Sequence, residues 1–185
     1  MTRLRILAWI CVAAILAAPA AAAPAKRYTD PTLGYTISYP ANWSLDTHYV
    51  YDQLGPGHVI KGVAFTIPPA LTAGTNLGGD TKLSIESLPG RNCAPAQFVD
   101  PAQNVHALRA DGRVYTVATS EDAGAGNRYV TTVFVLDGIS PCLAVRNFIH
   151  YSAIENFDPG TVKPFDRARL VAAFDRIRAT LTLGK

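Results

Sequence analysis

The 185-residue sequence contains 17 basic and 14 acidic residues, and 49% of its residues are hydrophobic. Without the first 22 residues, which include two arginines, 17 − 2 = 15 basic residues remain against 14 acidic ones, a net charge of +1. This balance argues against binding to nucleic acid or to an anionic membrane surface through a long-range electric field. The remaining 185 − 22 = 163 residues are enough for one domain with a substantial core.

Residues 1–22 have the three parts of a secretory signal peptide. Arg3 and Arg5 come first, an apolar run extends over about residues 6–18, and small residues surround Ala22. The run is shorter than the roughly 20 apolar residues that span a bilayer. We therefore expect cleavage near Ala22, export to the periplasm or the exterior, and no stable membrane anchor afterwards. The alternative is an uncleaved anchor.

The cysteines support the same compartment. Cys11 lies inside the apolar run, next to Trp9 and Ile10 rather than small residues, so lipid attachment is not expected there. Cys93 and Cys142 are the two that remain after cleavage, and two cysteines in an exported chain predict a disulfide. A catalytic thiol is the alternative, but the sequence has no Cys-x-x-Cys motif.

Most of the chain after the signal has the pattern of short strands. We expect a mobile segment at residues 23–32 and a single domain over residues 33–185. Alternation is clearest early in that domain, where Tyr35, Ile37 and Tyr39 fall on one face. Strands are expected at residues 33–40, 48–52, 58–67, 81–88, 113–120, 128–138 and 141–151. The last two are the most apolar, which places them at the sheet centre.

Residues 163–181 have the pattern of one amphipathic helix. Leu170, Phe174, Ile177 and Leu181 recur at helical spacing, and charged residues take the other faces. Strands first and a helix last predict an α+β domain, in which an antiparallel sheet of about seven or eight strands is covered by the C-terminal helix. The long Gly/Pro-rich stretch at residues 68–80 is a candidate functional or mobile loop.

No motif of known chemistry occurs in the sequence. There is no Gly-x-Ser-x-Gly elbow of a hydrolase, and the four histidines lack metal-ligand spacing. The glycines at residues 74–82 lead into a strand and fail the phosphate-loop pattern. We therefore expect no enzyme activity, no cofactor and no metal site, although a convergent catalytic triad leaves no local signature.

Residues 144–160 join an apolar run to a polar loop. His150 ends the run and is expected to be structural, while Glu155 and Asn156 are exposed enough to join a recognition surface. Asp158-Pro159-Gly160 is typical of a turn before the terminal helix.

Two resemblances are visible. Residues 34–43, "GYTISYPANW", resemble the first strand and following tryptophan of PsbP-like domains, small α+β modules that also occur in exported bacterial proteins. A further resemblance is to periplasmic inhibitors of invertebrate-type lysozyme, which insert a loop with Ser-Gly and a nearby tyrosine into the lysozyme cleft. In "DGRVY" at residues 111–115, Gly112 and Tyr115 match that loop, and Asp111 replaces the serine. The resemblance implies a binding role for Asp111, Gly112 and Tyr115.

Three functional hypotheses follow. The first is an exported domain that binds a protein partner in the envelope or outside the cell, with inhibition of a lytic enzyme such as lysozyme as its finer form. The second is a PsbP-like accessory or assembly domain that docks on a larger complex. The third is a hydrolase with a hidden triad, in which His150 or His106 is the base.

Overall fold

A computed structural model describes residues 24–184 of the chain. The predicted signal peptide at residues 1–22, Cys11 included, lies outside the described residues. Among the described residues, no helix is both long enough and apolar enough to cross a membrane.

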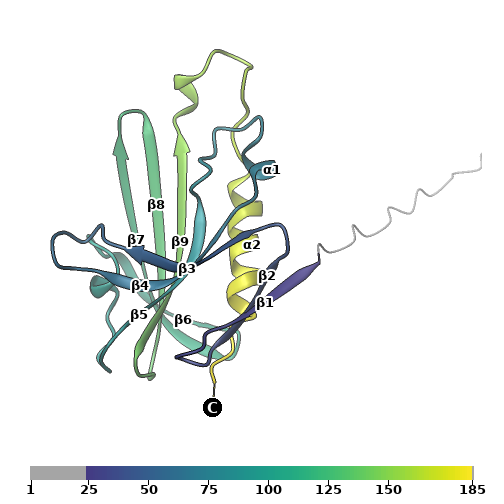
Figure 1. The fold of residues 1–185 in the computed structure, drawn as a ribbon. Helices are drawn as coiled ribbons and strands as arrows, with labels where there is room; N and C mark the ends of the chain where they lie inside the picture. Colours follow the sequence, from purple (N-terminus) through teal and green to yellow (C-terminus); the bar gives the residue numbers. More distant parts are fainter. Residues whose placement is uncertain (1–23, 185) are drawn as a thin grey trace, which may run out of the picture.

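The domain is α+β, as predicted, and its main sheet is antiparallel throughout (Figure 1). Seven strands pair in the order β3-β4-β5-β9-β8-β7-β6, so the apolar strand β9 lies at the centre. The strands are β3 (Ser44–Tyr51), β4 (Ile60–Thr66), β5 (Lys82–Leu88), β6 (Gln103–Ala110), β7 (Arg113–Gly124), β8 (Asn127–Leu136) and β9 (Cys142–Ser152). The helical segments are α1 (Pro69–Thr72), η1 (Pro95–Gln97), η2 (Ile154–Asn156) and α2 (Arg167–Ala179).

The N-terminal segment corrects two expectations. Strands β1 (Ala25–Thr29) and β2 (Thr36–Pro40) form a separate two-stranded sheet. The strand that was expected at residues 33–40 therefore does not join the main sheet. Residues 25–29 are a paired strand and not a mobile segment. The Asp30 carboxylate stabilises the connecting turn because its Oδ1 accepts from the backbone N–H of Thr32 at 2.9 Å and of Leu33 at 2.6 Å.

Strand β6 was not predicted. It pairs with β7 at the sheet edge, and all but two of its residues are exposed. Period-two alternation arises when one face of a strand is buried, and this edge strand lacks such a face. A register shift between Gln103 and His106, with Asn104 at a φ of 50°, further breaks the pattern.

Helix α2 covers one face of the main sheet together with the β1-β2 hairpin (Figure 1). Leu170, Phe174, Ile177 and Leu181 are all buried, as the helical spacing predicted. Trp43 packs edge-on against Phe174, with ring centroids 5.7 Å apart. The Asp166 side chain caps the helix by accepting from the Arg169 N–H at 2.9 Å.

The opposite face of the sheet is covered only in part. A smaller apolar cluster lies under η1 and includes Phe98, Val133, Val135 and Ala144. The predicted disulfide between Cys93 and Cys142 is present and attaches the η1 segment to the start of β9. Beyond this cluster the face is open, and the candidate site lies there.

Removing the disulfide should lower stability measurably. The cysteines are 49 residues apart, and closing a loop of that length restricts the unfolded chain by about 4 kcal/mol in the loop-entropy model. We expect Cys93→Ala/Cys142→Ala to lose about that much free energy of unfolding in urea titrations. Reduced wild-type protein is the control and should match the variant. Equal stability of oxidised and reduced protein would contradict the structural role of this bond.

Candidate functional site

A cleft of about 550 Å³ opens on the face of the sheet that α2 does not cover. Its volume falls in the range of about 300–1,000 Å³ that is usual for ligand sites. The aromatic side chains that line it come from β3, β8 and β9 and are Tyr49, Tyr51, Tyr129 and Phe148.

Strand alternation brings the polar side chains of this site together. In β9, Val145 and Ile149 enter the core under α2, so Arg146 and Phe148 point to the other face. The antiparallel register sets Ser84 of β5 opposite Arg146, and Lys82 opposite Phe148. Two adjacent central strands therefore supply the floor of the cleft.

The floor is built on a buried ion pair. Arg146 donates from Nε to Glu86 Oε1 at 2.7 Å and from Nη2 to Glu86 Oε2 at 2.8 Å, and both side chains have no solvent exposure. Nη2 also donates to the Phe98 carbonyl, and Ser84 Oγ donates to Glu86 Oε1 at 2.8 Å. The Tyr51 ring stacks on the guanidinium, 3.6 Å from its carbon to the ring centroid.

Burial and neighbouring charges shift the pKa of Arg146 and of Tyr49. Burial alone would lower the pKa of Arg146, but the hydrogen bonds and charge of Glu86 more than offset it and raise that pKa. Burial also raises the pKa of Tyr49, and the Glu86 carboxylate raises it further. The Tyr49 hydroxyl therefore stays protonated at neutral pH.

One nitrogen of Arg146 has no hydrogen-bond partner among residues 24–184. Nη1 is buried and makes no hydrogen bond to any described residue, whereas Nε and Nη2 are both engaged. Because Arg146 also lines the cleft, its remaining N–H groups can serve an acceptor that enters from there.

Lys82 stands between two aromatic rings of the cleft. Its Nζ lies 5.6 Å from the centroid of Tyr49 and 5.3 Å from that of Phe148. Such contacts stabilise a cation without neutralising it. Tyr49 comes from edge strand β3, where its register partner is Gly62 of β4.

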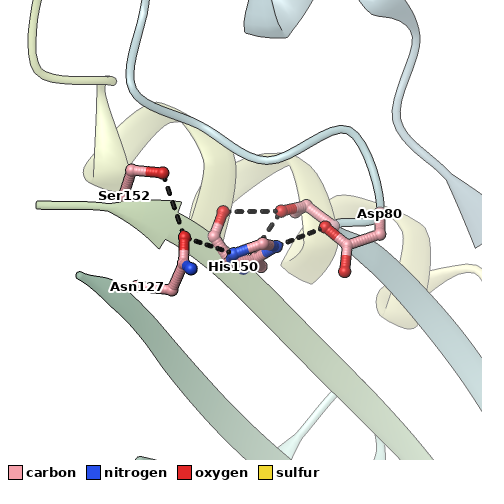
Figure 2. Close-up of polar contacts among 5 residues, drawn as sticks. Asp80, Asn127, His150 and Ser152 are labelled. Atoms are coloured by element: carbon pink, nitrogen blue, oxygen red, sulfur yellow. Dashed lines mark hydrogen bonds and ion pairs between the residues drawn. The ribbon is translucent and has the colours of Figure 1, made fainter. Parts of the chain in front are cut away.

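A hydrogen-bonded chain centred on His150 borders the cleft (Figure 2). Asp80 and Asn127 lie on opposite sides of the ring: Asp80 Oδ1 is 2.6 Å from Nδ1, and Asn127 Oδ1 is 3.0 Å from Nε2. Ser152 Oγ also donates to Asn127 Oδ1 at 3.0 Å. The Tyr129 ring stacks on the imidazole, with centroids 4.6 Å apart.

These contacts give His150 a structural role in holding residues 76–81 against β9. Its carbonyl accepts from the Gly78 N–H at 2.8 Å, and a Cβ at Gly78 would lie 2.6 Å from His150 Nδ1. Asn76 adds a further tie by donating from Nδ2 to the Ser152 carbonyl at 2.7 Å. Part of the 68–80 stretch is thus packed on the sheet, and Asp80 is positioned at the cleft.

The hydrolase hypothesis finds only part of a triad here. Asp80 and His150 have the geometry of an orienting acid and a base, but Ser152 bonds to Asn127 and not to His150. His106 is exposed on edge strand β6, and its Nδ1 contacts the Asn104 carbonyl at 2.7 Å. Within the part of the chain that the structure describes, neither histidine has the nucleophile–base hydrogen bond that such a mechanism uses.

The predicted recognition loop requires a correction. Tyr115 is fully buried in the core beside Phe134, so it cannot contact a partner in the folded protein. Asp111 and Gly112 form the β6–β7 turn with φ angles of 55° and 72°. Asp111 Oδ2 accepts from Arg178 Nη1 at 2.8 Å, which ties this turn to α2. In β7, which follows this turn, the side chain of Tyr115 faces inward and packs in the core.

The other residues from the polar loop lie elsewhere. Asn156 donates from Nδ2 to the Gly126 carbonyl at 2.8 Å, and Glu155 is exposed in η2. Neither lines the cleft. Within residues 24–184, no group of three or more His, Cys, Asp or Glu side chains is placed to hold a metal ion.

Sequence reasoning missed the main charged residues of the site. Glu86 and Arg146 both lie inside strands, and Arg146 interrupts the most apolar run of residues 23–185. A charged side chain at such a position is almost never buried without a partner. The charged residues inside these two strands were therefore the signal that could have revealed the pair. The pairing itself depends on register between strands about 60 residues apart.

The chain matches no protein-family model and no curated protein. Its structure is similar to the solution structure of the cyanobacterial PsbP protein (CyanoP) from Synechocystis sp. PCC 6803, with a TM-score of 0.48 and 14% identity over 92% of this chain and 99% of that one. A crystal structure from Bacteroides thetaiotaomicron VPI-5482 has a TM-score of 0.48 and 13% identity, and covers 86% of this chain and 48% of that one. This chain thus spans about half of the latter.

The comparisons give no support to the resemblance to lysozyme inhibitors.

Breaking the Glu86–Arg146 pair on one side should be costly. Arg146→Met leaves a buried carboxylate without its partner, and we expect a loss of about 3–5 kcal/mol in the free energy of unfolding. The double variant Glu86→Leu/Arg146→Met should lose much less than the sum of the single variants, as a urea double-mutant cycle would show. Additive losses would mean that the two side chains do not act as a pair.

Replacing Tyr115 should test its burial. We expect Tyr115→Ala to lose about 3–5 kcal/mol of stability, because it leaves a large cavity in the core. Urea denaturation measures this loss. A variant with wild-type stability would show that the ring is not a core residue and would reopen its predicted role in binding.

Proposed function

We propose that the mature protein is an exported binding domain that holds a segment of a protein partner in the cleft between β3, β5, β8 and β9. The observation that carries this proposal is the clustering of four aromatic side chains around a polar floor: Tyr49, Tyr51, Tyr129 and Phe148. None of the four is among the buried residues of the two hydrophobic clusters. Tyrosine and arginine are enriched among the residues that dominate protein–protein binding energy.

The cleft is held in place before any partner arrives. Tyr51 is fixed on the Arg146 guanidinium, and Tyr129 is stacked on His150, which is itself held by hydrogen bonds on both sides. Aromatic side chains that are already ordered lose little conformational entropy on binding. The site therefore favours binding as its task, and it presents no assembled catalytic group.

Export is part of the proposal. The Cys93–Cys142 disulfide favours an oxidising compartment, and the signal-like sequence at residues 1–22 supplies a route to it. We place the partner in the envelope or outside the cell.

Two finer forms of the function differ in their structural support. Inhibition of a lytic enzyme was predicted from a loop with Tyr115, and the burial of that residue leaves this form without its contact residue. An accessory or assembly role needs only a stable surface that docks on a larger complex. We favour the accessory role, with the cleft as the docking surface.

The test places a photo-crosslinking residue at Gln53, which is exposed at the cleft. Crosslinked partners from the envelope are identified, and the yield is compared in Tyr129→Ala and Phe148→Ala variants. We expect at least a tenfold loss of crosslinking, since buried aromatic contacts are worth 2 kcal/mol or more. Each variant is checked for an unchanged fold by circular dichroism.

Val105→Ala is the matched control, because Val105 is 56% exposed on β6 at the sheet edge and does not line the cleft. Its crosslinking yield should equal that of the wild type. Full crosslinking in both aromatic variants, or a loss in the Val105 variant alone, would move the binding surface away from the cleft.

A further inference from the structure

The cleft separates its charges by depth. Lys82 and Arg146 lie on its floor among the aromatic rings, whereas Asp52, Asp100 and Asp122 are exposed around it. With Asp80, the lining sums to 2 − 4 = −2. The field near the opening therefore attracts positive charge, and the groups beneath it attract negative charge or an acceptor oxygen.

The Lys82 ammonium excludes a cationic ligand from the space between the rings. That space is a cation-binding environment, but Nζ already occupies it, within 5.6 Å of both ring centroids. None of the ion pairs among residues 24–184 includes Lys82. Its positive charge therefore has no ion-pair partner among the described residues.

Arg146 provides a second, independent indication of a ligand. Its side chain is fully buried and Nη1 makes no hydrogen bond to a described residue, although a buried donor normally has a partner. The guanidinium cannot lose its proton and so cannot adapt to an apolar neighbour. An acceptor oxygen from a bound molecule, such as a peptide carbonyl, completes this group.

The acidic surround decides between classes of anionic ligand. Nucleic acid and other polyanions would bring several negative charges past Asp52, Asp100 and Asp122. A single carboxylate that is flanked by positive groups has charges complementary to the cleft. The carboxylate matches the positive groups on the floor, and the flanking positive groups match the exposed aspartates around it.

We infer that the cleft binds an extended peptide segment in which one acidic side chain is flanked by basic ones. The central carboxylate pairs with Lys82, a backbone carbonyl accepts from Arg146 Nη1, and the flanking ammonium or guanidinium groups meet Asp52, Asp100 and Asp122. This inference rests on the proposed function and adds the chemistry of the segment that the site recognises.

The test uses acetylated and amidated tripeptides, titrated into the oxidised mature protein and followed by NMR chemical shifts. Lys-Glu-Lys should bind at least tenfold more tightly than Lys-Gln-Lys or Glu-Lys-Glu, with shifts centred on β5 and β9. Lys82→Met should remove the preference for glutamate over glutamine. Lys82→Glu should instead favour a positive central side chain, so that Lys-Lys-Lys binds this variant more tightly than Lys-Glu-Lys.

Lys61→Met is the matched control, because Lys61 lies on neighbouring β4 and does not line the cleft. It should bind the tripeptides as the wild type does. Equal affinities for Lys-Glu-Lys and Lys-Gln-Lys, or no shifts at millimolar peptide, would overturn this inference. If crosslinking still depends on Tyr129 and Phe148 in that case, the binding function stands with a different ligand. If the crosslinking also fails, the cleft itself is not the site.

Discussion

The buried ion pair of Glu86 and Arg146 is the interaction on which the open face of this protein depends. It joins the two central strands and reaches outward in three directions: to Ser84 on the same strand, to the Phe98 carbonyl after η1, and to the Tyr51 ring on edge strand β3. One side chain, Arg146, thus holds the disulfide-linked segment and the sheet edge in a fixed relation. Apolar side chains at the two positions would fill the space without specifying that relation.

The sheet has two faces with different tasks. One carries Leu83, Ile85, Val145 and Ile149 against α2 and supplies most of the hydrophobic core. The other carries Lys82, Glu86, Arg146 and Phe148 from the same two strands. Because most of the hydrophobic core lies on the first face, the second can keep half-buried aromatic side chains and a buried ion pair. This division explains how a small domain maintains an open cleft on its central strands.

Polar ties around His150 connect a long loop to that surface. The segment at residues 76–81 would otherwise be a solvent-exposed connection, but backbone and side-chain hydrogen bonds hold it along β9. Asp80 and Tyr129 are placed at the cleft by the same ring. The arrangement resembles an acid–base pair in outline, yet Asn127 stands where a nucleophile would have to be.

Local patterns in the sequence were enough for several features. The spacing of Leu170, Phe174, Ile177 and Leu181 determined a helix with a buried face, and the alternation of Tyr35, Ile37 and Tyr39 determined a strand with one buried face. The disulfide was predicted from the two cysteines that follow a signal-like N-terminal sequence. The separation of β1 and β2 into their own sheet did not follow, because alternation gives no information on which strands pair.

The site lay beyond such patterns for the same physical reason. Tyrosine is a common residue type in recognition surfaces, and only the register of the β6–β7 hairpin decided that Tyr115 enters the core. Glu86 and Arg146 are charged residues in apolar surroundings, and pairing across β5 and β9 decided that they are buried together. The sequence by itself determined the terminal helix and most of the strands, since those depend on near neighbours, but it did not reveal β1 or the exposed edge strand β6. The tertiary structure decided which side chains meet, because contacts between distant strands depend on register and on what covers each face.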